Sequence, residues 1–361
     1  MKVAVITGSR ADWNGLGMVA KCLRKEHHIA IDVIAIGQHY ANQESLSVII
    51  DDGFDPKLYR TNFQEDMAFG SASAAIAVAG ALDSHLPDMA LVLGDRFEIL
   101  GAATAASLRG IPLAHIGGGD ITEGSVDNKL RYAITALADL HFTTNLESYQ
   151  RLDNAETPGG IYNLGTPALD RIAQTPITDR FVLFKRLGLR ESKRNVLVAF
   201  HAATAEPDPT AGCAAMLDAL NGLPHTSFVI VGTNSDTGSQ RITDLLSLFA
   251  ASNSTRCILR DNLPPEDFYG CLQHFDCMIG NSSAGLVETA GFGIPVVNIG
   301  NRQKGRPEPA NVFSCIANAE AIGMTTQIAM AGRCVGVSNP YGDGHSAPRI
   351  AKAMVNYLGE T

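Results

Sequence analysis

Acidic side chains and a histidine follow several apolar runs of this chain, at the points where those runs end. These residues are Asp95, Asp120, Asp127 and His201. A carboxylate or an imidazole at the edge of a cleft can be tuned by burial for proton transfer. The four side chains are therefore candidates for general acid and base chemistry.

Each of the four also has an ordinary structural interpretation. Asp95 is a residue type common in turns, and Asp120 and Asp127 suit the N-cap of a helix. The segment DNKLRYAITALA begins a helical pattern at Asp127, so capping and catalysis both stay open there. His201 ends an apolar run and fits either a buried core or a cleft, where it would carry a proton or contact a phosphate.

A second group of residues is suited to an anion. The segment GNSSAG, which holds Asn281, Ser282 and Ser283, opens a predicted helix with small residues. The N-terminus of a helix attracts negative charge, and the two hydroxyls add hydrogen bonds. Glu288, two turns into the same predicted helix, is placed to accept ribose hydroxyls. A plain serine N-cap and a solvated glutamate are the alternatives.

Three arginines complete this group. They are Arg10, Arg302 and Arg306, which lie after the first apolar run and in the segment NIGNRQKGR. A guanidinium binds phosphate oxygens through two parallel hydrogen bonds, so these residues are candidates for holding a diphosphate. A surface ion pair is the alternative for each of them.

The elements that would position these residues recur along the whole chain. Short apolar runs without polar alternation are typical of strands buried on both faces of a parallel sheet. The predicted strands are 3–7, 31–36, 89–93, 113–116, 196–200, 228–231, 278–279 and 296–299, and the predicted helices are 70–86, 98–109, 128–137, 211–220 and 238–249. This alternation predicts βαβ units, whose ligands bind beyond the carboxyl ends of the strands.

The length of the chain predicts two domains. Its 361 residues exceed what one hydrophobic core usually supports. We therefore predict an α/β protein of two Rossmann-like domains, whose parallel sheets face each other across a cleft. We place the first domain, with the acid and base residues, at 1–170 and the second, with the nucleotide site, at 171–361.

Composition and missing motifs exclude other classes of function. The formal net charge of −9 argues against nonspecific nucleic-acid binding. No GxGxxG follows the first strand and no GxxxxGK[ST] occurs, so neither a dinucleotide cofactor nor an NTPase is indicated. The seven cysteines form no CxxC pair, and no metal-ligand spacing occurs, so we predict free thiols and no metal. No apolar run approaches the roughly 18 residues of a membrane span, and we expect a cytoplasmic protein.

Together the strand-end segments resemble a known family. TGSRAD, LGDRFE, HIGGGDITEGSVDNKLRYAIT, TNSDTGS, IGNSSAGLVETAGFGIPVVNIGNRQKGR and SNPYGDG occur in this order between Val3 and about Ile350. This set is similar to the hydrolysing UDP-N-acetylglucosamine 2-epimerases of sialic and legionaminic acid synthesis. GSRAD after the first strand, in place of GTRPE, favours the hydrolysing branch over the non-hydrolysing epimerases.

The resemblance implies a fold, a site and an assembly. The implied fold is the two-domain GT-B arrangement, with a last helix that crosses back to the first domain. By resemblance, the reaction centre is lined by Asp95, Asp127, Arg131 and His201, phosphate and ribose are held by Ser282, Ser283 and Glu288, the diphosphate is held by Arg10, and the segment Leu259–Phe268 lies over the uracil. A homodimer or homotetramer without a cofactor is implied as well.

The implied reaction converts UDP-N-acetylglucosamine to N-acetylmannosamine and UDP. The C2 proton is not next to a carbonyl, so its direct removal is unfavourable. UDP therefore leaves from C1 first, and a base removes the C2 proton to give a glycal. Protonation on the opposite face of C2 and addition of water at C1 complete the reaction.

Several positions of the reaction centre depart from the family's pattern, among them Asn128, Tyr132 and Ala202, where members usually have an acidic residue, a histidine and a proline. Members usually read HIHGGE or HIEGGE where this chain has HIGGGD, so Gly117 replaces a side chain and Asp120 replaces a glutamate. The residues on the nucleotide side are intact. We hypothesise that Asp120 takes over the work of the group missing at position 117.

Several functions fit these residues. The same reaction on UDP-2,4-diacetamido-2,4,6-trideoxyglucose differs only at C4 and C6 of the sugar, and family frequency alone favours UDP-N-acetylglucosamine. A GT-B glycosyltransferase would need an acceptor. A non-hydrolysing epimerase would release no UDP, and a nucleotide-sugar sensor would bind UDP tightly without turnover.

Overall fold

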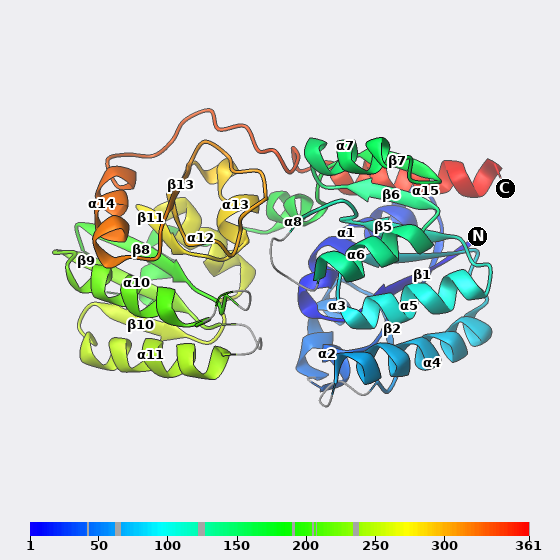
Figure 1. Ribbon diagram of the computed structural model, residues 1–361, viewed down its shortest axis with the longest axis horizontal. Coiled ribbons are helices and arrows are strands. Elements are labelled where there is room, and N and C mark those ends of the chain that lie inside the picture. The colour runs from blue at the N-terminus through cyan, green and yellow to red at the C-terminus, as the bar shows by residue number, and fades with distance from the viewer. Residues whose placement is uncertain are drawn as a thin grey trace. The chain divides into compact units, whose positions relative to one another are not determined.

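The computed structural model describes residues 1–41, 43–61, 66–121, 127–189, 192–203, 206, 208–233 and 238–360. In this part of the chain two compact units are present, and Figure 1 shows their elements. Unit 1 holds the chain up to Gln174 together with the stretch from Tyr341 onward, and unit 2 holds Thr175–Pro340.

Unit 1 is built on a seven-stranded parallel sheet with the strand order β3-β2-β1-β4-β5-β6-β7. Its strands are β1 (Lys2–Thr7), β2 (Ala30–Ala35), β3 (Pro56–Leu58), β4 (Met89–Leu93), β5 (Leu113–Ile116), β6 (Leu140–Thr143) and β7 (Gly160–Asn163). Its helices are α1 (Arg10–Glu26), α2 (Gln38–Ala41), η1 (Gln43–Leu46), α3 (Ser47–Asp51), α4 (Met67–His85), α5 (Phe97–Leu108), α6 (Asp127–Leu137), α7 (Leu146–Asn154), α8 (Ala168–Gln174) and α15 (Ser346–Glu360).

The apolar sequence of β1 explains its place in the middle of this sheet. Successive side chains of a strand point to opposite faces. Val3 and Val5 pack in one cluster with residues of α1 and α15, whereas Ala4 and Ile6 pack in another with residues of α4 and α5. Helices therefore cover both faces, which is why the strand has no polar alternation.

Unit 2 is built on a six-stranded parallel sheet with the strand order β10-β9-β8-β11-β12-β13. Its strands are β8 (Arg194–Ala199), β9 (Thr226–Val231), β10 (Cys257–Arg260), β11 (Cys277–Gly280), β12 (Val296–Ile299) and β13 (Val312–Cys315). Its helices are α9 (Arg180–Leu187), α10 (Ala211–Asn221), α11 (Ser239–Ser252), α12 (Pro265–His274), α13 (Ala284–Val287), η2 (Ala290–Phe292) and α14 (Ala319–Ala329).

The predicted fold class, two Rossmann-like α/β domains with parallel sheets, is confirmed. Each predicted strand and each predicted helix overlaps an element of the same type. The sequence analysis missed five strands, which are β3, β6, β7, β10 and β13.

The last helix packs within unit 1. α15 contacts α1 and α8, and the backbone N–H groups of Ser346 and Ala347 donate to the Asp170 carboxylate at 3.0 and 2.8 Å. Asp170 lies in α8, so the boundary that we predicted after residue 170 falls inside this helix. Unit 2 begins at Thr175.

The helix α4 contradicts our expectation that no apolar segment of the chain is long enough to span a membrane. By length and composition alone this helix is able to cross a bilayer. Its inner side chains, among them Ala74 and Val78, are buried in unit 1. α5 packs closely along α4, because a Cβ at Gly101 would lie 2.2 Å from the Ser71 carbonyl oxygen. In this structure α4 is an integral layer of unit 1.

Candidate active site

Each sheet reverses its strand order at one point, and several of the predicted site residues follow the strands there. The reversal falls between β1 and β4 in unit 1 and between β8 and β11 in unit 2. Ligands of open α/β sheets bind beyond the carboxyl ends of the strands at such switch points. The segments that follow these strands carry Arg10, Asp95, His201 and Ser282.

Asp95 follows β4 and forms an ion pair with Arg131 of α6. The Arg131 side chain is only 3% exposed, and it also donates to the Asp120 carbonyl oxygen at 2.5 Å and to Asn128 Oδ1 at 2.9 Å. A buried guanidinium held by several acceptors fixes the carboxylate that pairs with it. The structure thus brings together two of the residues that the resemblance implies.

The Asp120 carboxylate has a different set of partners. It accepts hydrogen bonds from Thr144 Oγ1 at 2.8 Å, from Asn145 Nδ2 at 3.1 Å and from Ser148 Oγ at 2.6 Å. These donors lie before α7 and in its first turn, so Asp120 fastens the segment after β5 to α7. This arrangement favours an anchoring role over the proton transfer that we hypothesised. Asp127 begins α6, and its side chain lies outside the described residues.

The glycines after β5 differ in how much space surrounds them, and only Gly117 has open space beside β4. Gly117 and Gly119 have φ angles of +89° and +80°, which favour glycine. A Cβ at Gly119 would lie 2.5 Å from the Ser148 carbonyl oxygen, whereas a Cβ at Gly117 would meet only the Gly94 nitrogen, at 4.0 Å.

Burial lowers the pKa of His115 to about 3, and its Nε2 lies 2.8 Å from the Gly94 carbonyl oxygen. His115 is therefore a neutral, structural histidine.

Sequence reasoning missed a buried acidic pair at the same switch point. Glu98 is 1% exposed and accepts from Arg96 through Nε at 3.2 Å and Nη2 at 3.0 Å. Asp12 is buried and accepts from the Gly8 N–H at 3.0 Å. Burial raises the pKa of Asp12 to about 6, although Arg96 lowers it in part, so this carboxyl suits proton transfer near neutral pH. The signal was present, because these residues stand in the segments TGSRAD and LGDRFE.

Asn281 holds the switch point of unit 2 together. Its Oδ1 accepts from the His201 N–H at 2.7 Å, and its Nδ2 donates to the His201 carbonyl oxygen at 2.9 Å. The Asn281 side chain is buried, and these hydrogen bonds position the loop that carries His201. The half-buried His201 ring has its Nδ1 3.3 Å from Thr233 Oγ1.

Ser282 and Ser283 follow at the start of α13. This helix has only one turn and ends at Glu288, which corrects the prediction that Glu288 lies two turns inside it. One turn supplies little helix dipole. The Ser283 side chain makes no capping hydrogen bond, so an N-cap role does not account for it. The preceding Gly280 is required sterically, because a Cβ there would lie 1.9 Å from the Ala199 carbonyl oxygen.

Glu288 lies beside aromatic rings. Burial raises its pKa to about 7, and a hydrogen bond with Tyr269 lowers it in part. The Tyr269 ring stacks on Phe292 with a centroid separation of 6.1 Å. A carboxylate next to flat aromatic surfaces suits a nucleoside, whose ribose donates hydrogen bonds and whose base stacks. α12, which carries Tyr269, begins within the segment predicted to cover the uracil.

The loop after β12 is fastened to this switch point. Arg302 donates to the Ala202 carbonyl oxygen at 3.3 Å and to the Asn281 carbonyl oxygen at 3.1 Å. Gln303, which the sequence analysis did not single out although it lies in NIGNRQKGR, donates to the same Asn281 oxygen at 2.8 Å. Arg306 lies half-buried in this loop. In unit 1, Arg10 begins α1 and is exposed.

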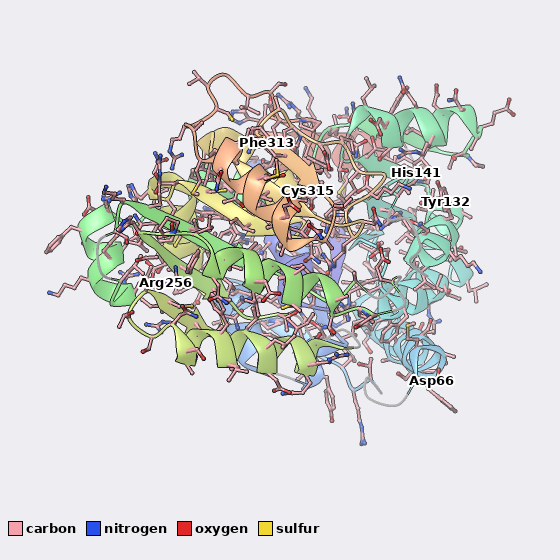
Figure 2. The ribbon with its side chains drawn as sticks, turned by 60° about the vertical axis from the view of Figure 1, so that its left-hand side comes forward. Asp66, Tyr132, His141, Arg256, Phe313 and Cys315 are labelled. Atoms are coloured by element: carbon pink, nitrogen blue, oxygen red, sulfur yellow. The ribbon has the colours of Figure 1, made fainter. Side chains whose placement is uncertain are left out.

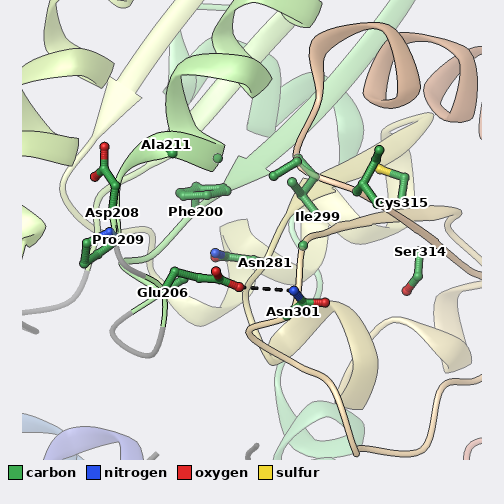
Figure 3. Close-up of a pocket in the computed structure, with 15 residues that line it drawn as sticks. Phe200, Glu206, Asp208, Pro209, Ala211, Asn281, Ile299, Asn301, Ser314 and Cys315 are labelled. Carbon is green, nitrogen blue, oxygen red and sulfur yellow. Dashed lines mark hydrogen bonds between the residues drawn. The ribbon is translucent and has the colours of Figure 1, made fainter. Parts of the chain in front are cut away.

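A pocket of about 530 Å³ opens beside these residues in unit 2, at the carboxyl ends of β8, β12 and β13 (Figure 3). Phe200 and Ile299 give it an apolar floor, and Glu206 and Asp208 line its side. Among the described lining residues there is no lysine or arginine, so these carboxylates would repel a diphosphate. The pocket is therefore distinct from the anion site predicted at the serines of α13.

Metal and thiol chemistry have no evident site in the described parts of the chain. No group of three or more His, Cys, Asp or Glu side chains there could hold a metal ion. The seven cysteines are free, and burial raises the pKa of Cys213 to about 12. Such a thiol carries almost no thiolate at neutral pH and is a poor nucleophile.

The amino-acid sequence matches the family model of UDP-N-acetylglucosamine 2-epimerase over residues 21–355. The chain belongs to this family. The resemblance seen in the strand-end motifs is thereby confirmed. At the family level, the chain is a UDP-sugar 2-epimerase.

Two curated relatives cover most of the chain. A hydrolysing UDP-N,N'-diacetylbacillosamine 2-epimerase of Legionella pneumophila is 31% identical over 98% of this chain and 95% of the relative. A hydrolysing GDP/UDP-N,N'-diacetylbacillosamine 2-epimerase of Campylobacter jejuni is 28% identical over 88% of this chain and 85% of the relative. The similarity to both thus includes the acid and base segments as well as the nucleotide segments.

A solved structure shares the fold. The UDP-GlcNAc 2-epimerase of Methanocaldococcus jannaschii, crystallised in complex with UDP-GlcNAc and UDP, matches with a TM-score of 0.81. It is 15% identical and covers 99% of this chain and 100% of its own. This likeness supports the GT-B type of fold.

Proposed function

We propose that this chain is a hydrolysing UDP-sugar 2-epimerase. The observation that supports it best is the match of nearly the whole chain to an epimerase family. The predicted acid and base residues follow strands at one switch point, and the predicted phosphate-binding serines follow a strand at the other. We propose that unit 1 carries the groups that act on the sugar and that unit 2 carries the groups that bind the nucleotide.

The proposed reaction consumes one water and needs no redox step. The C1–O bond breaks, and its electron pair leaves with UDP. A base then removes the C2 proton, and a C1–C2 double bond forms in a 2-acetamidoglycal. A proton returns to the opposite face of C2, and a water hydroxyl adds to C1. The products are UDP and the free 2-epimerised sugar.

Unit 1 supplies the proton transfers in this account. We assign one face of C2 to Asp95, which Arg131 holds in place, and the other to Asp127. Asp12 is a further acid or base, because burial raises its pKa to about 6. Asp120 anchors the turn after β5 and does not take part in proton transfer.

Unit 2 supplies the nucleotide site. The hydroxyls of Ser282 and Ser283 donate to phosphate oxygens, and Glu288 accepts the ribose hydroxyls. His201 of this unit, and the exposed Arg10 of unit 1, stabilise the negative charge that develops on the leaving diphosphate. Arg302 and Arg306 complete the positive surroundings from the loop after β12.

We propose UDP-N,N'-diacetylbacillosamine, the 2,4-diacetamido-2,4,6-trideoxy sugar, as the preferred substrate. The sequence alone leaned toward UDP-N-acetylglucosamine by family frequency. The two relatives named for the diacetamido sugar shift the proposal, since one is 31% and the other 28% identical over most of the chain. UDP-N-acetylglucosamine is the second candidate, because the matching family is described by it.

Release of UDP from each of the two UDP-sugars tests the proposal. We expect the diacetamido sugar to give the higher kcat/KM. Asp95→Asn should lower kcat by about 10²–10⁴, whereas Asp244→Asn, an equal change on the exposed face of α11, should leave it unchanged. Epimerisation without UDP release would contradict the hydrolysing reaction. Tight UDP binding without turnover of either sugar would indicate a sensor or a transferase instead.

We also propose a cytoplasmic location and a homo-oligomer. The seven cysteines are free thiols, as is usual in a reducing compartment.

A further inference from the structure

A single arginine binds backbone carbonyl groups of two different elements of unit 2. Arg333 follows α14, in the stretch 331–340, which forms neither helix nor strand. Its Nη1 donates to the Phe292 carbonyl oxygen of η2 at 2.7 Å. Its Nη2 donates at the end of α12, to the carbonyl oxygens of Leu272, Gln273 and Phe275 at 3.1, 2.5 and 2.8 Å. One side chain thus fastens η2 to the end of α12.

The guanidinium of Arg333 suits this place chemically. The last carbonyl groups of a helix have no partner within the helix, and they carry the negative end of its dipole. A guanidinium is positively charged and holds its donors in a fixed planar fork, so it can join two sets of acceptors. α12 has ten residues and η2 only three, and helices this short depend on contacts outside themselves. The position of η2 against α12 therefore depends on contacts such as those of Arg333.

The same stretch makes two further contacts of this kind. The Cys334 N–H donates to the Gly293 carbonyl oxygen at 2.9 Å, directly after η2. Gly293 has a φ angle of +62°, and a Cβ there would lie 2.2 Å from the Cys334 carbonyl oxygen. Asn339 Nδ2 donates to the carbonyl oxygen of Val287, the last residue of α13, at 2.8 Å. Residues 333–339, the clamp segment, therefore bind the ends of α12, η2 and α13.

The three elements that the clamp segment binds carry the residues suited to a nucleoside. Tyr269 belongs to α12, Phe292 to η2, and Glu288 directly follows α13. The Tyr269 and Phe292 rings stack at an angle of 21° and a centroid separation of 6.1 Å, and Tyr269 forms a hydrogen bond with Glu288. The positions of these rings therefore depend on where α12 and η2 meet, and Arg333 joins these two elements.

We propose that Arg333 is a positioning residue for the nucleoside part of the substrate, which acts through the stacked rings of Tyr269 and Phe292 and through Glu288. This inference rests on the proposed nucleotide site of unit 2. Hydrogen bonds weaken steeply when their geometry is lost, so a shift of η2 against α12 weakens the binding of the nucleotide. The acid and base residues belong to unit 1 and keep their places. Such a loss is equal in the ground state and the transition state, so it raises KM and leaves kcat unchanged.

A purely stabilising role is the alternative, and Arg256 of the same unit provides the control for it. Arg256, labelled in Figure 2, donates to the Leu223 carbonyl oxygen at 2.9 Å. It also donates through Nε and Nη2 to Asn253, the C-cap of α11, at 3.1 and 3.0 Å. Arg256 directly precedes β10, so it lies at the amino edge of the sheet, whereas the proposed nucleotide site lies at the carboxyl edge. Its loss should cost stability without reaching that site.

Calorimetric titration with UDP, together with the kinetics of UDP release from UDP-N,N'-diacetylbacillosamine, tests this role in the full chain. We expect Arg333→Gln and Arg256→Gln both to lower the melting temperature. Only Arg333→Gln should raise the Kd for UDP and the KM, each about tenfold, with kcat within about twofold of the wild type. If Arg333→Gln binds UDP as tightly as Arg256→Gln, the positioning role is wrong. A wild type that does not bind UDP would instead overturn the proposed nucleotide site itself.

Arg333→Lys gives an independent measurement if the glutamine variant does not fold. An ammonium group keeps the positive charge at the end of α12, but it lacks the planar fork that also reaches η2. We expect this variant to recover most of the melting temperature and to bind UDP more weakly than the wild type, by about 2–10-fold. Wild-type affinity for UDP in Arg333→Lys would show that the link between α12 and η2 is not needed, and it would overturn the proposal.

Discussion

Asp95 and Asp120 have different surroundings at the edge of the unit 1 sheet. Asp95 pairs with Arg131, and its side chain is 24% exposed, so a substrate can reach it. The Asp120 oxygens are occupied by donors from Thr144, Asn145 and Ser148. We infer that Asp95 takes part in the chemistry and that Asp120 holds the turn in place.

Asp120→Asn separates these two roles. The new amide nitrogen would face hydroxyl and amide donors instead of accepting from them, which costs about 1–3 kcal/mol when a buried partner is lost. We expect a lower melting temperature and a kcat within about tenfold of the wild type, whereas Asp95→Asn loses about 10²–10⁴. An unchanged melting temperature with a kcat as low as that of Asp95→Asn would restore the acid–base role of Asp120.

Because the pKa of Glu288 is raised, we expect nucleotide binding to depend on pH. Its pKa is raised by burial to about 7, and the ribose hydroxyls donate best to the ionised carboxylate. Affinity for UDP should therefore rise as the pH increases from about 6 to 8 and level off above. Calorimetric titration of Glu288→Gln should show weaker binding, by about 1.5–3 kcal/mol at pH 8. Because UDP itself titrates near pH 6, the difference between wild type and variant is the quantity to compare, and an equal pH dependence in both would contradict this role.

At the scale of elements, the buried strands were predictable and the sheet edges were not. β1, β4, β8 and their neighbours are short apolar runs because helices cover both of their faces. β3, β7, β10 and β13 are the outermost strands of the two sheets, and they mix polar with apolar side chains. β6 is interior but carries the buried His141 (Figure 2), whose Nε2 lies 2.8 Å from the Pro158 carbonyl oxygen.

The sequence indicated where the candidate site residues lie, but not which role each of them has. Strand ends gave the positions of Asp95, His201 and Ser282, because all ligands of a parallel sheet gather at one edge. The roles of Asn281 and Asp120 depend on hydrogen bonds between loops that are far apart in the sequence. Such pairings have no local pattern.

The absence of a side chain at Gly280 allows β11 to approach β8 closely. A Cβ there would lie 1.9 Å from the Ala199 carbonyl oxygen, and the φ angle is +147°. Gly280→Ala should therefore destabilise unit 2 by about 2–5 kcal/mol through overpacking and backbone strain, and it should weaken UDP binding because Asn281 follows directly. Gly222→Ala is the control, since its φ is −77° and the nearest atom to its Cβ is at 3.4 Å. Equal melting temperatures of the two variants would show that the strands have room to separate.

At the scale of the whole molecule, the proposed reaction needs groups from both units. Acid and base residues belong to unit 1, and the serines of α13 with Glu288 belong to unit 2. The chain itself connects them, because it enters unit 2 at Thr175 and is back in unit 1 from Tyr341, before α15 packs on α1 and α8. Neither unit alone carries the complete set of proposed residues. We therefore expect that neither unit, on its own, hydrolyses or epimerises the substrate.

Turnover in D₂O, followed by proton and phosphorus NMR, tests directly whether the enzyme both releases UDP and breaks the C2–H bond of the sugar. The wild-type enzyme is incubated with UDP-N,N'-diacetylbacillosamine and, separately, with UDP-N-acetylglucosamine. The account predicts that UDP is released together with a free, 2-epimerised sugar that carries deuterium at C2. Release of UDP with the original hydrogen at C2, or a 2-epimerised sugar still linked to UDP, would contradict it.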